Sequence, residues 1–360
     1  MPVVFLTGFP GFLASGLLPR ILERAPSHQT VCLVQPQFID VARARLKQIQ
    51  NLQPAFRGRI ELREGDITHP GLGLTDPAAL QKRTSEIFHL AALYDLCAPR
   101  EVAMKVNLEG TSNVLDFAAG TPQLQRLHYV STCYVSGRHR GSFSEDDLEK
   151  GQSFHNPYEE SKYLAELAVR TRMNDGLPAT IYRPAIVVGD SQTGATQKYD
   201  GPYFVIRWLL RQPRVAVLPV TGDPTATQVN LVPQDYIVQA ISYLSGLQSS
   251  AGRTYHLADP HPLTVEELVT LLGQATHRRI VRIPLPLWFA KFAINHLLGV
   301  DRLMQIPSPA IDYFVHPTRY ACEQTLRALN GSGIRVPEFQ TYVDRLVNFV
   351  RLHPKPSHGF

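Results

Sequence analysis

The chain has 360 residues, of which 44% are hydrophobic and 19% charged, and its formal net charge is +5. This composition is typical of a soluble globular enzyme, and the length predicts two domains or one enlarged domain. No run of five basic residues occurs, so nothing indicates a nucleic-acid partner. The four cysteines are widely spaced, so we expect no metal site, no disulfide framework and a cytoplasmic location.

Two apolar stretches do not predict a membrane span. Residues 1–18 lack the basic start of a signal peptide, and a better explanation follows below. Residues 285–300 are interrupted by Lys291, Asn295 and His296, and this stretch is too short and too polar to cross a bilayer. We therefore expect no transmembrane segment.

Short aliphatic runs alternate with helical patterns over the first 190 residues. The expected strands are 3–6, 31–34, 60–64, 86–90, 127–131 and 180–188. The expected helices are 12–24, 40–52, 100–119 and 157–175. This alternation predicts an α/β fold, a Rossmann-type doubly wound parallel sheet, as a dinucleotide-binding domain over residues 1–188.

The pattern changes after Gly189, and we expect a smaller, mostly helical substrate-binding region over 189–360. A polar surface loop is expected first, over 189–200. Residues 228–232 and 254–257 are expected to return to the Rossmann sheet as strands. A capping box, Thr264 with Glu267, starts one of the expected helices. These helices are 203–211, 233–244, 264–276, 321–329 and 338–352.

A glycine-rich loop joins the first expected strand to the first helix, in the order that dinucleotide binding requires. Gly8 permits a tight turn, Gly11 lets the backbone approach a pyrophosphate, and Ala14 lets helix and strand pack closely. The alternative interpretation is a tight turn without a ligand. The expected cofactor-binding residues here are Gly8, Phe9, Pro10, Gly11, Phe12 and Leu13.

Two further strand ends fit the same cofactor. Asp66 and Ile67 follow the third strand, where a carboxylate can accept from the adenine amino group. The alternative is an aspartate that caps a turn. Ala91 and Ala92 follow the fourth strand, and their small side chains would let the cofactor pass close to the backbone.

The residue that ends the second strand separates NAD from NADP. A carboxylate there would bind the ribose 2′-OH, but this strand ends at Gln35. Arg43 and Arg45 follow on the next helix and can neutralise a 2′-phosphate. We therefore expect NADP(H), with NAD(H) as the alternative and a solvated helix face as the other explanation for the arginines.

A Y-x-x-x-K pair provides the candidate catalytic groups. Tyr158 and Lys162 share one face of the expected helix, so the ammonium can lower the pKa of the phenol. Thr132 ends the fifth strand, at the edge of the sheet where ligands bind. Tyr158 would give a proton to a substrate oxygen while Thr132 donates a hydrogen bond to it, and Lys162 would also hold the cofactor's ribose.

Taken in order, these motifs resemble the extended short-chain dehydrogenase/reductase superfamily. Within it, the chain is most similar to the branch of fatty acyl-CoA reductases and thioester-reductase domains of carboxylic acid reductases and peptide synthetases. The matching stretches are residues 7–13, 65–67, 89–92, 107–111, 131–132, Tyr158 with Lys162, and 182–184. Softer cues to the branch are residues 32–34, 65–68, 72–74, 189–194 and 333–337.

The resemblance implies roles for further residues. Thr132, Tyr158 and Lys162 would form the catalytic triad, which Asn107 would support through a water. The stretch from Pro184 to Val187 would lie beside the nicotinamide, so both residues are expected to bind cofactor. One position departs from the branch, which usually has arginine where this chain has Gln35, and this weakens the argument for NADPH.

Three functions fit these residues. The first is NAD(P)H-dependent reduction of a carbonyl, either an acyl thioester or the aldehyde derived from it. The second is a dehydrogenase or epimerase that acts on a hydroxysteroid-like alcohol or a sugar nucleotide. The third is a non-catalytic cofactor-binding regulator, against which the intact triad argues. A Pro-rich and aromatic segment, 283–300, could cover a lipid-like chain or form an ordinary core helix. A homodimer is the candidate assembly.

Overall fold

The computed structural model describes residues 1–289, 292, 311–312 and 315–354. A seven-stranded sheet lies at its centre, with the order β12-β7-β5-β4-β1-β2-β3 and every pair parallel. The strands are β1 Val3–Thr7, β2 Gln29–Val34, β3 Ile60–Glu64, β4 Thr84–His89, β5 Arg126–Val130, β7 Ala179–Pro184 and β12 Thr254–Leu257. The predicted Rossmann sheet is confirmed.

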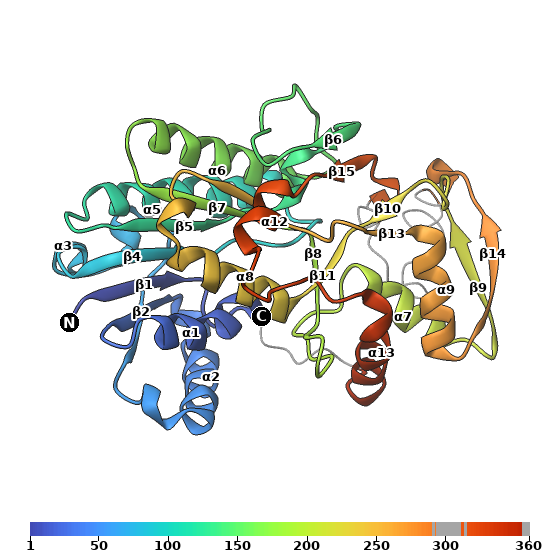
Figure 1. Cartoon of the computed structure of the whole chain (residues 1–360), viewed down its shortest axis with the longest axis horizontal. Helices are drawn as coiled ribbons and strands as arrows, with labels where there is room; N and C mark the ends of the chain where they lie inside the picture. Colours follow the sequence, from blue (N-terminus) through green and yellow to red (C-terminus); the bar gives the residue numbers. More distant parts are fainter. Residues whose placement is uncertain (290–291, 293–310, 313–314, 355–360) are drawn as a thin grey trace.

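Helices cover both faces of this sheet, so the central strand β1 is buried at every residue (Figure 1). One face carries α1 Phe12–Arg24, α2 Ile39–Leu52 and α8 Gln234–Gly246. The other carries α5 Gly110–Ala119 and α6 Pro157–Asn174, with the short α3 Pro77–Gln81 at its end. The strand order reverses between β1 and β4, and ligands bind at the carboxyl edge beside such a reversal.

A second hydrophobic core lies beside the sheet, at the right of Figure 1. Two parallel strands, β9 Val215–Val220 and β14 Arg279–Pro284, pack on the helices of this region. The helices are α7 Pro202–Leu210, α9 Val265–Thr276 and α13 Val343–Leu352. The predicted capping box starts α9, because Thr264 and Glu267 exchange both hydrogen bonds. α12 Glu323–Leu329 packs back on α8 and β12.

Only one of the two segments expected to return to the sheet does so. Residues 254–257 join it as β12, but the expectation for 228–232 is wrong. This segment forms β10 Gln228–Val229, which pairs with β13 Leu263–Thr264, and β11 Leu231–Pro233, which pairs with β8 Ile186–Val188. Between the two strands, the Asn230 amide exchanges two 2.8 Å hydrogen bonds with the backbone of Asp259, so this segment lies beyond the end of β12.

Three other boundaries differ from expectation. The expected strand 180–188 divides at Ala185, since β8 leaves the sheet to pair with β11. The expected helix 100–119 contains a π-helical stretch, η4 Met104–Glu109, between α4 Arg100–Ala103 and α5. Strands β9 and β14, and the small pair β6 Gly141–Phe143 with β15 Thr318–Tyr320, were not expected. Most of the segment 283–300 lies outside the described residues.

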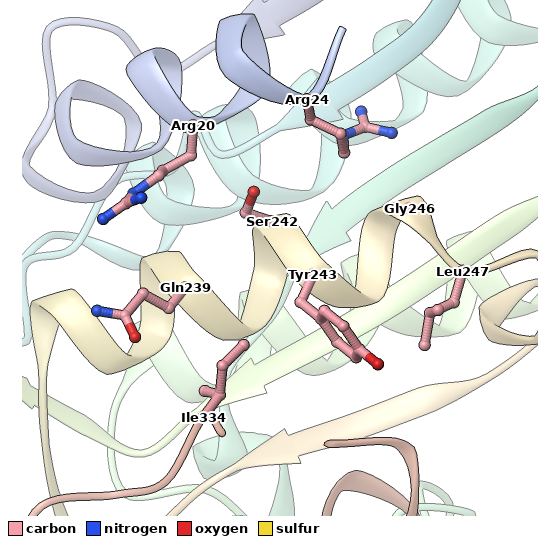
Figure 2. A pocket seen from close by; sticks show the side chains of 8 residues that line it. All are labelled: Arg20, Arg24, Gln239, Ser242, Tyr243, Gly246, Leu247 and Ile334. Atoms are coloured by element: carbon pink, nitrogen blue, oxygen red, sulfur yellow. The ribbon is translucent and has the colours of Figure 1, made fainter. Parts of the chain in front are cut away.

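A hollow of about 630 Å³ opens between α1 and α8, shown in Figure 2. Its two arginines are already engaged, because Arg20 pairs with Glu23 and Arg24 reaches buried Glu86 at 2.6 Å. The full lining is Arg20, Arg24, Gln239, Ser242, Tyr243, Gly246, Leu247 and Ile334. This hollow lies at the end of α1 opposite the glycine-rich loop. Among the described helices, none is long and apolar enough to cross a membrane.

Candidate active site

A cleft of about 840 Å³ lies at the carboxyl edge of the sheet. It brings together most of the residues that the sequence singles out: Gly8, Phe9, Gly11, Phe12, Leu13, Gln35, Ile67, Ala91, Ala92, Thr132, Tyr158, Lys162, Pro184 and Val187. The other candidates, Pro10, Arg43, Arg45, Asp66 and Asn107, are not in its lining. The described residues contain no cluster of His, Cys, Asp or Glu that could hold a metal ion.

The glycine-rich loop forms one end of the cleft. Gly8 has a φ of +91°, and a Cβ there would lie 2.7 Å from the Ala91 nitrogen. A Cβ on Gly11 would lie 2.6 Å from the carbonyl oxygen of Gly8, which accepts a hydrogen bond from the Gly11 nitrogen. The protein's own backbone therefore requires both glycines, in addition to any demand made by a ligand.

The first turn of α1 fits a pyrophosphate. The helix begins at Phe12 after Gly11, with no side-chain cap and no acidic residue in its first turn. Its N–H groups and dipole are therefore free to attract an anion at the edge of the cleft. A nicotinamide dinucleotide fits this end of the cleft.

The end of β2 is organised by an amide–carboxylate pair. Gln35 donates from its side-chain nitrogen to Asp66 Oδ2 at 2.9 Å and accepts from Gln37 at 3.1 Å. The other oxygen of Asp66 accepts from the Thr68 nitrogen. Asp66 thus holds a turn and Gln35, while its neighbour Ile67 lines the cleft. Its contact with adenine stays a prediction.

The two arginines expected to select NADPH lie outside the cleft lining, on α2. Arg43 is 64% exposed and pairs with Asp40 on the same helix at 3.1 Å. Arg45 is half-buried. A 2′-phosphate would have to draw either side chain toward the end of β2.

Two hydroxyl groups meet in the middle of the cleft. Thr132 follows β5, and its Oγ1 caps the short helix that begins at Cys133. Tyr158 lies in the first turn of α6, which Asn156 caps through the Glu159 nitrogen at 3.0 Å. Both side chains line the cleft, and the Thr132 hydroxyl acts on the pKa of the Tyr158 phenol. This pair can place two donors on one substrate oxygen.

The pKa of the Tyr158 phenol is higher than the sequence predicts. Burial raises its pKa, and the nearby Thr132 hydroxyl opposes the rise. The sequence argument expected the ammonium of Lys162 to lower this pKa. The structure differs because Lys162 donates elsewhere, to Tyr129 Oη at 3.0 Å and to the Val130 carbonyl at 2.9 Å. The Tyr158 phenol is therefore protonated throughout the neutral range.

Lys162 is buried one helical turn after Tyr158, 3% exposed. Burial lowers its pKa to about 7, while Glu166 opposes the shift. Its Nζ also lies 4.5 Å from the centre of the Tyr129 ring. A lysine with this pKa is present in both its charged and its neutral form at neutral pH.

Asn107 contacts the triad's helix and not the triad itself. It lies in the π-helical stretch η4, where its side chain donates to Ser161 Oγ at 2.9 Å. The same amide accepts from the Leu93 nitrogen and donates to the Leu93 carbonyl. Asn107 therefore holds the loop that follows β4 against α6. Its water-mediated support of Lys162 stays a prediction.

Sequence reasoning missed four residues near the triad. Tyr129 holds Lys162, and Tyr94 lies edge-on to Tyr158 with ring centres 5.0 Å apart. Lys198 and Asp200 line the cleft, although the loop that carries them was expected only to cover the surface. The alternation of β5 places Tyr129 on the same face as Leu127, a signal that was available. No pattern in the loop 189–200 indicates its return to the cleft.

The sheet, the glycine-rich loop and the Thr132–Tyr158–Lys162 arrangement define an NAD(P)-dependent oxidoreductase of the extended short-chain dehydrogenase/reductase type. The sequence model of the male sterility protein family matches residues 6–241. The chain belongs to this NAD-binding family. It is 28% identical to the aldehyde reductase lnbA of Aspergillus flavus over 88% of this chain, but it spans only 32% of that protein.

Two solved structures share the fold over nearly the whole chain. The terminal R domain from the myxalamid PKS-NRPS biosynthetic pathway superposes with a TM-score of 0.83 at 27% identity, covering 98% of this chain and 91% of that domain. The reductase (R) domain of a nonribosomal peptide synthetase from Mycobacterium tuberculosis gives a TM-score of 0.74 at 22% identity, covering 98% and 92%. The chain is therefore similar in extent to a single such domain.

Proposed function

We propose that this chain reduces an acyl thioester to the aldehyde, with NADPH as the preferred cofactor. The observation that carries the proposal is that the hydroxyl groups of Thr132 and Tyr158 line one cleft together with Lys162 and the glycine-rich loop. The likeness to aldehyde reductase lnbA and to a synthetase's reductase domain supports a carbonyl as the reacting group. The same triad could serve an alcohol dehydrogenase or epimerase, so the substrate decides between them.

The hydroxyl pair matches the charge that develops on a thioester carbonyl. When bound, the reduced nicotinamide supplies hydride to the carbonyl carbon. Thr132 and Tyr158 would then donate to the oxyanion, and donors aimed at such a charge are worth about 2.7–4 kcal/mol each. Tyr158 keeps its proton because burial raises its pKa. Collapse of the oxyanion expels the thiolate and leaves the aldehyde.

The preference for NADPH rests on the end of β2. Among the described residues that line the cleft, the acidic ones are Asp95 and Asp200, and neither follows β2. Gln35 stands where a carboxylate would select the 2′-OH of NADH. We expect titration to show tighter binding of NADPH, and we expect one of Arg43→Ala and Arg45→Ala to weaken it roughly 10- to 150-fold. Tighter binding of NADH would contradict the preference.

The substrate is tested by a panel with both nicotinamides: acyl thioesters, free aldehydes, hydroxysteroids and nucleotide sugars. We expect oxidation of NADPH with thioesters and release of one thiol per aldehyde, measured with a thiol reagent. Turnover confined to nucleotide sugars or steroids would replace the proposal with the dehydrogenase or epimerase function. Cofactor binding without turnover of any class would favour a regulator.

The compartment and assembly belong to the same proposal. All four cysteines are free, which suits the reducing cytoplasm that we propose. A homodimer is the assembly that we propose, and sedimentation of the purified chain tests it.

A further inference from the structure

Two hydrogen bonds hold the Nζ atom of Lys162 against the end of β5. This atom donates to the hydroxyl oxygen of Tyr129 at 3.0 Å and to the carbonyl oxygen of Val130 at 2.9 Å. The lysine itself lines the cleft, whereas Tyr129 is 1% exposed and lies behind the lining. Tyr129 can therefore act on a ligand in the cleft only through Lys162.

The ring of Tyr129 is a fixed support for this contact. The residue lies inside the sheet, paired with His89 of β4 on one side and with Ile181 of β7 on the other. The rings of His89 and Tyr129 have their centres 5.7 Å apart. Both ring nitrogens of His89 are in turn within hydrogen-bonding distance of threonine hydroxyls, at 2.8 and 3.1 Å. The hydroxyl oxygen of Tyr129 is thus an acceptor in a fixed place.

The charge of Lys162 decides what it can offer a ligand from this position. An ammonium group has three N–H donors, and Tyr129 and Val130 accept from two of them. The third is left for a ligand in the cleft. A neutral amine has only two N–H donors, so with both acceptors filled it presents a lone pair to the cleft. It then has no charged donor for a ribose oxygen.

We propose that Tyr129 is a positioning residue whose hydroxyl, together with the Val130 carbonyl, fixes the Lys162 ammonium so that its one remaining N–H reaches the ribose of the nicotinamide cofactor. This rests on the proposed function and on the expected contact between Lys162 and the ribose. The Tyr129 hydroxyl also favours the ammonium over the amine, because a charged donor forms the stronger hydrogen bond. Loss of this hydroxyl should therefore remove part of the charge as well as the fixed direction.

The other titratable groups around Lys162 keep one charge state near neutral pH. Burial would raise the pKa of Glu166, one turn further along α6, but the Arg183 guanidinium at 2.6 Å lowers it, so this carboxylate is ionised. Burial lowers the pKa of His89 to about 3, so its imidazole is neutral, and the Tyr158 phenol is protonated. Within this set, Lys162 is therefore the group whose charge changes around pH 7.

The variant Tyr129→Phe removes the hydroxyl and keeps the ring. The ligand-free protein is isotope-labelled at lysine Cε for magnetic resonance, and the Lys162 signal is assigned by its absence in Lys162→Met. The dependence of this signal on pH gives the pKa of Lys162. We expect Tyr129→Phe to lower that pKa by about 1–2 units, the range for a hydrogen bond to a charged group.

Cofactor binding should follow the charge of the lysine. Calorimetric titration with NADPH should show Tyr129→Phe binding roughly 5- to 50-fold more weakly than the parent at about pH 7. At about pH 5 most of the lysine is charged in both proteins, so the two affinities should agree within about twofold. The titration of the cofactor's own phosphate is the same in both proteins and cancels from the comparison.

Tyr182→Phe is the matched control. Tyr182 is a buried tyrosine of the neighbouring strand β7, and its hydroxyl lies 3.1 Å from His128 Nδ1. This variant should keep the parent's Lys162 pKa and the parent's pH dependence of cofactor binding. Equal shifts in Tyr182→Phe would overturn the inference. So would an unchanged Lys162 pKa in Tyr129→Phe, or an affinity lost equally at pH 5 and pH 7, because a merely structural loss does not depend on the charge of Lys162.

Neither measurement needs an acyl substrate, which separates this inference from the proposed function. If Tyr129→Phe shows both shifts and the parent reduces no thioester, the inference stands and the proposed function falls. If thioesters are reduced while Tyr129→Phe keeps the parent's Lys162 pKa and pH dependence, the proposed function stands and the inference falls.

Discussion

The burial of the charged side chain of Lys162 should lower the free energy of unfolding of the protein. Its pKa is about 7 in the folded protein against 10.5 as the ordinary value, and the side chain is 3% exposed. At pH 7 this difference destabilises the folded state by roughly 4 kcal/mol, at about 1.4 kcal/mol per pKa unit. The two hydrogen bonds that Lys162 donates offset part of this destabilisation, by about 1–3 kcal/mol in all.

Replacing Lys162 by methionine keeps the length of the side chain and removes the charge. We expect Lys162→Met to unfold with about 1–3 kcal/mol more free energy than the parent at pH 7, while cofactor affinity and turnover are lost. The advantage should shrink above pH 7. There the folded lysine has lost its proton while the unfolded chain still binds one, so the parent's stability rises with pH up to about 10.5.

Denaturant unfolding of the ligand-free protein from pH 6 to 10 measures this difference. Lys82→Met serves as the matched control, because Lys82 is exposed, and it should shift stability by less than about 0.5 kcal/mol at every pH. A Lys162→Met protein less stable than the parent at pH 7, or an advantage that is equal at pH 7 and pH 10, would refute the reasoning.

Three other outcomes follow from the site and the buried network. Tyr158→Phe should retain cofactor binding and lose roughly 10²–10⁴-fold in kcat, and a tenth of the parent's kcat would contradict its role. Gly11→Val should abolish cofactor binding in a folded protein, because its Cβ would lie 2.6 Å from the Gly8 oxygen; normal cofactor titration would refute the loop assignment. Stability should fall below pH 6.5, since burial lowers the pKa of His128 to about 4 and the unfolded chain then binds the extra proton; His128→Gln should reduce this dependence, and the remainder comes from His89, His256 and His316, whose pKa values burial lowers to about 3.

The sequence was most informative where chemistry and periodicity coincide. Buried parallel strands such as β1 are short aliphatic runs, and α1 starts where the glycines end, so the sheet and the cofactor loop were predictable. Thr132 follows a strand, and Tyr158 and Lys162 share a face at the start of a helix, so their positions in the predicted elements indicate the cleft.

What the sequence could not supply depends on tertiary contacts. The pKa of Tyr158 is set by burial, because Lys162 donates to Tyr129 and Val130 instead. The segment 228–232 pairs with β13 and β8 and not with the sheet, and pairing between distant segments has no local signal. Asp200 gave no periodic signal, since the path of an irregular loop is fixed by the surfaces it meets.

The pair formed by Gln35 and Asp66 bears on any attempt to redesign coenzyme preference. The obvious change, Gln35→Arg, would place a guanidinium where an amide now donates to that carboxylate at 2.9 Å. The new charge would form an ion pair inside the protein and would have little left for an incoming phosphate. A designer would have to neutralise Asp66 in the same variant, and would then release the Thr68 turn that its other oxygen holds. A change of coenzyme preference therefore requires the residues that follow β2 and β3 to be changed together.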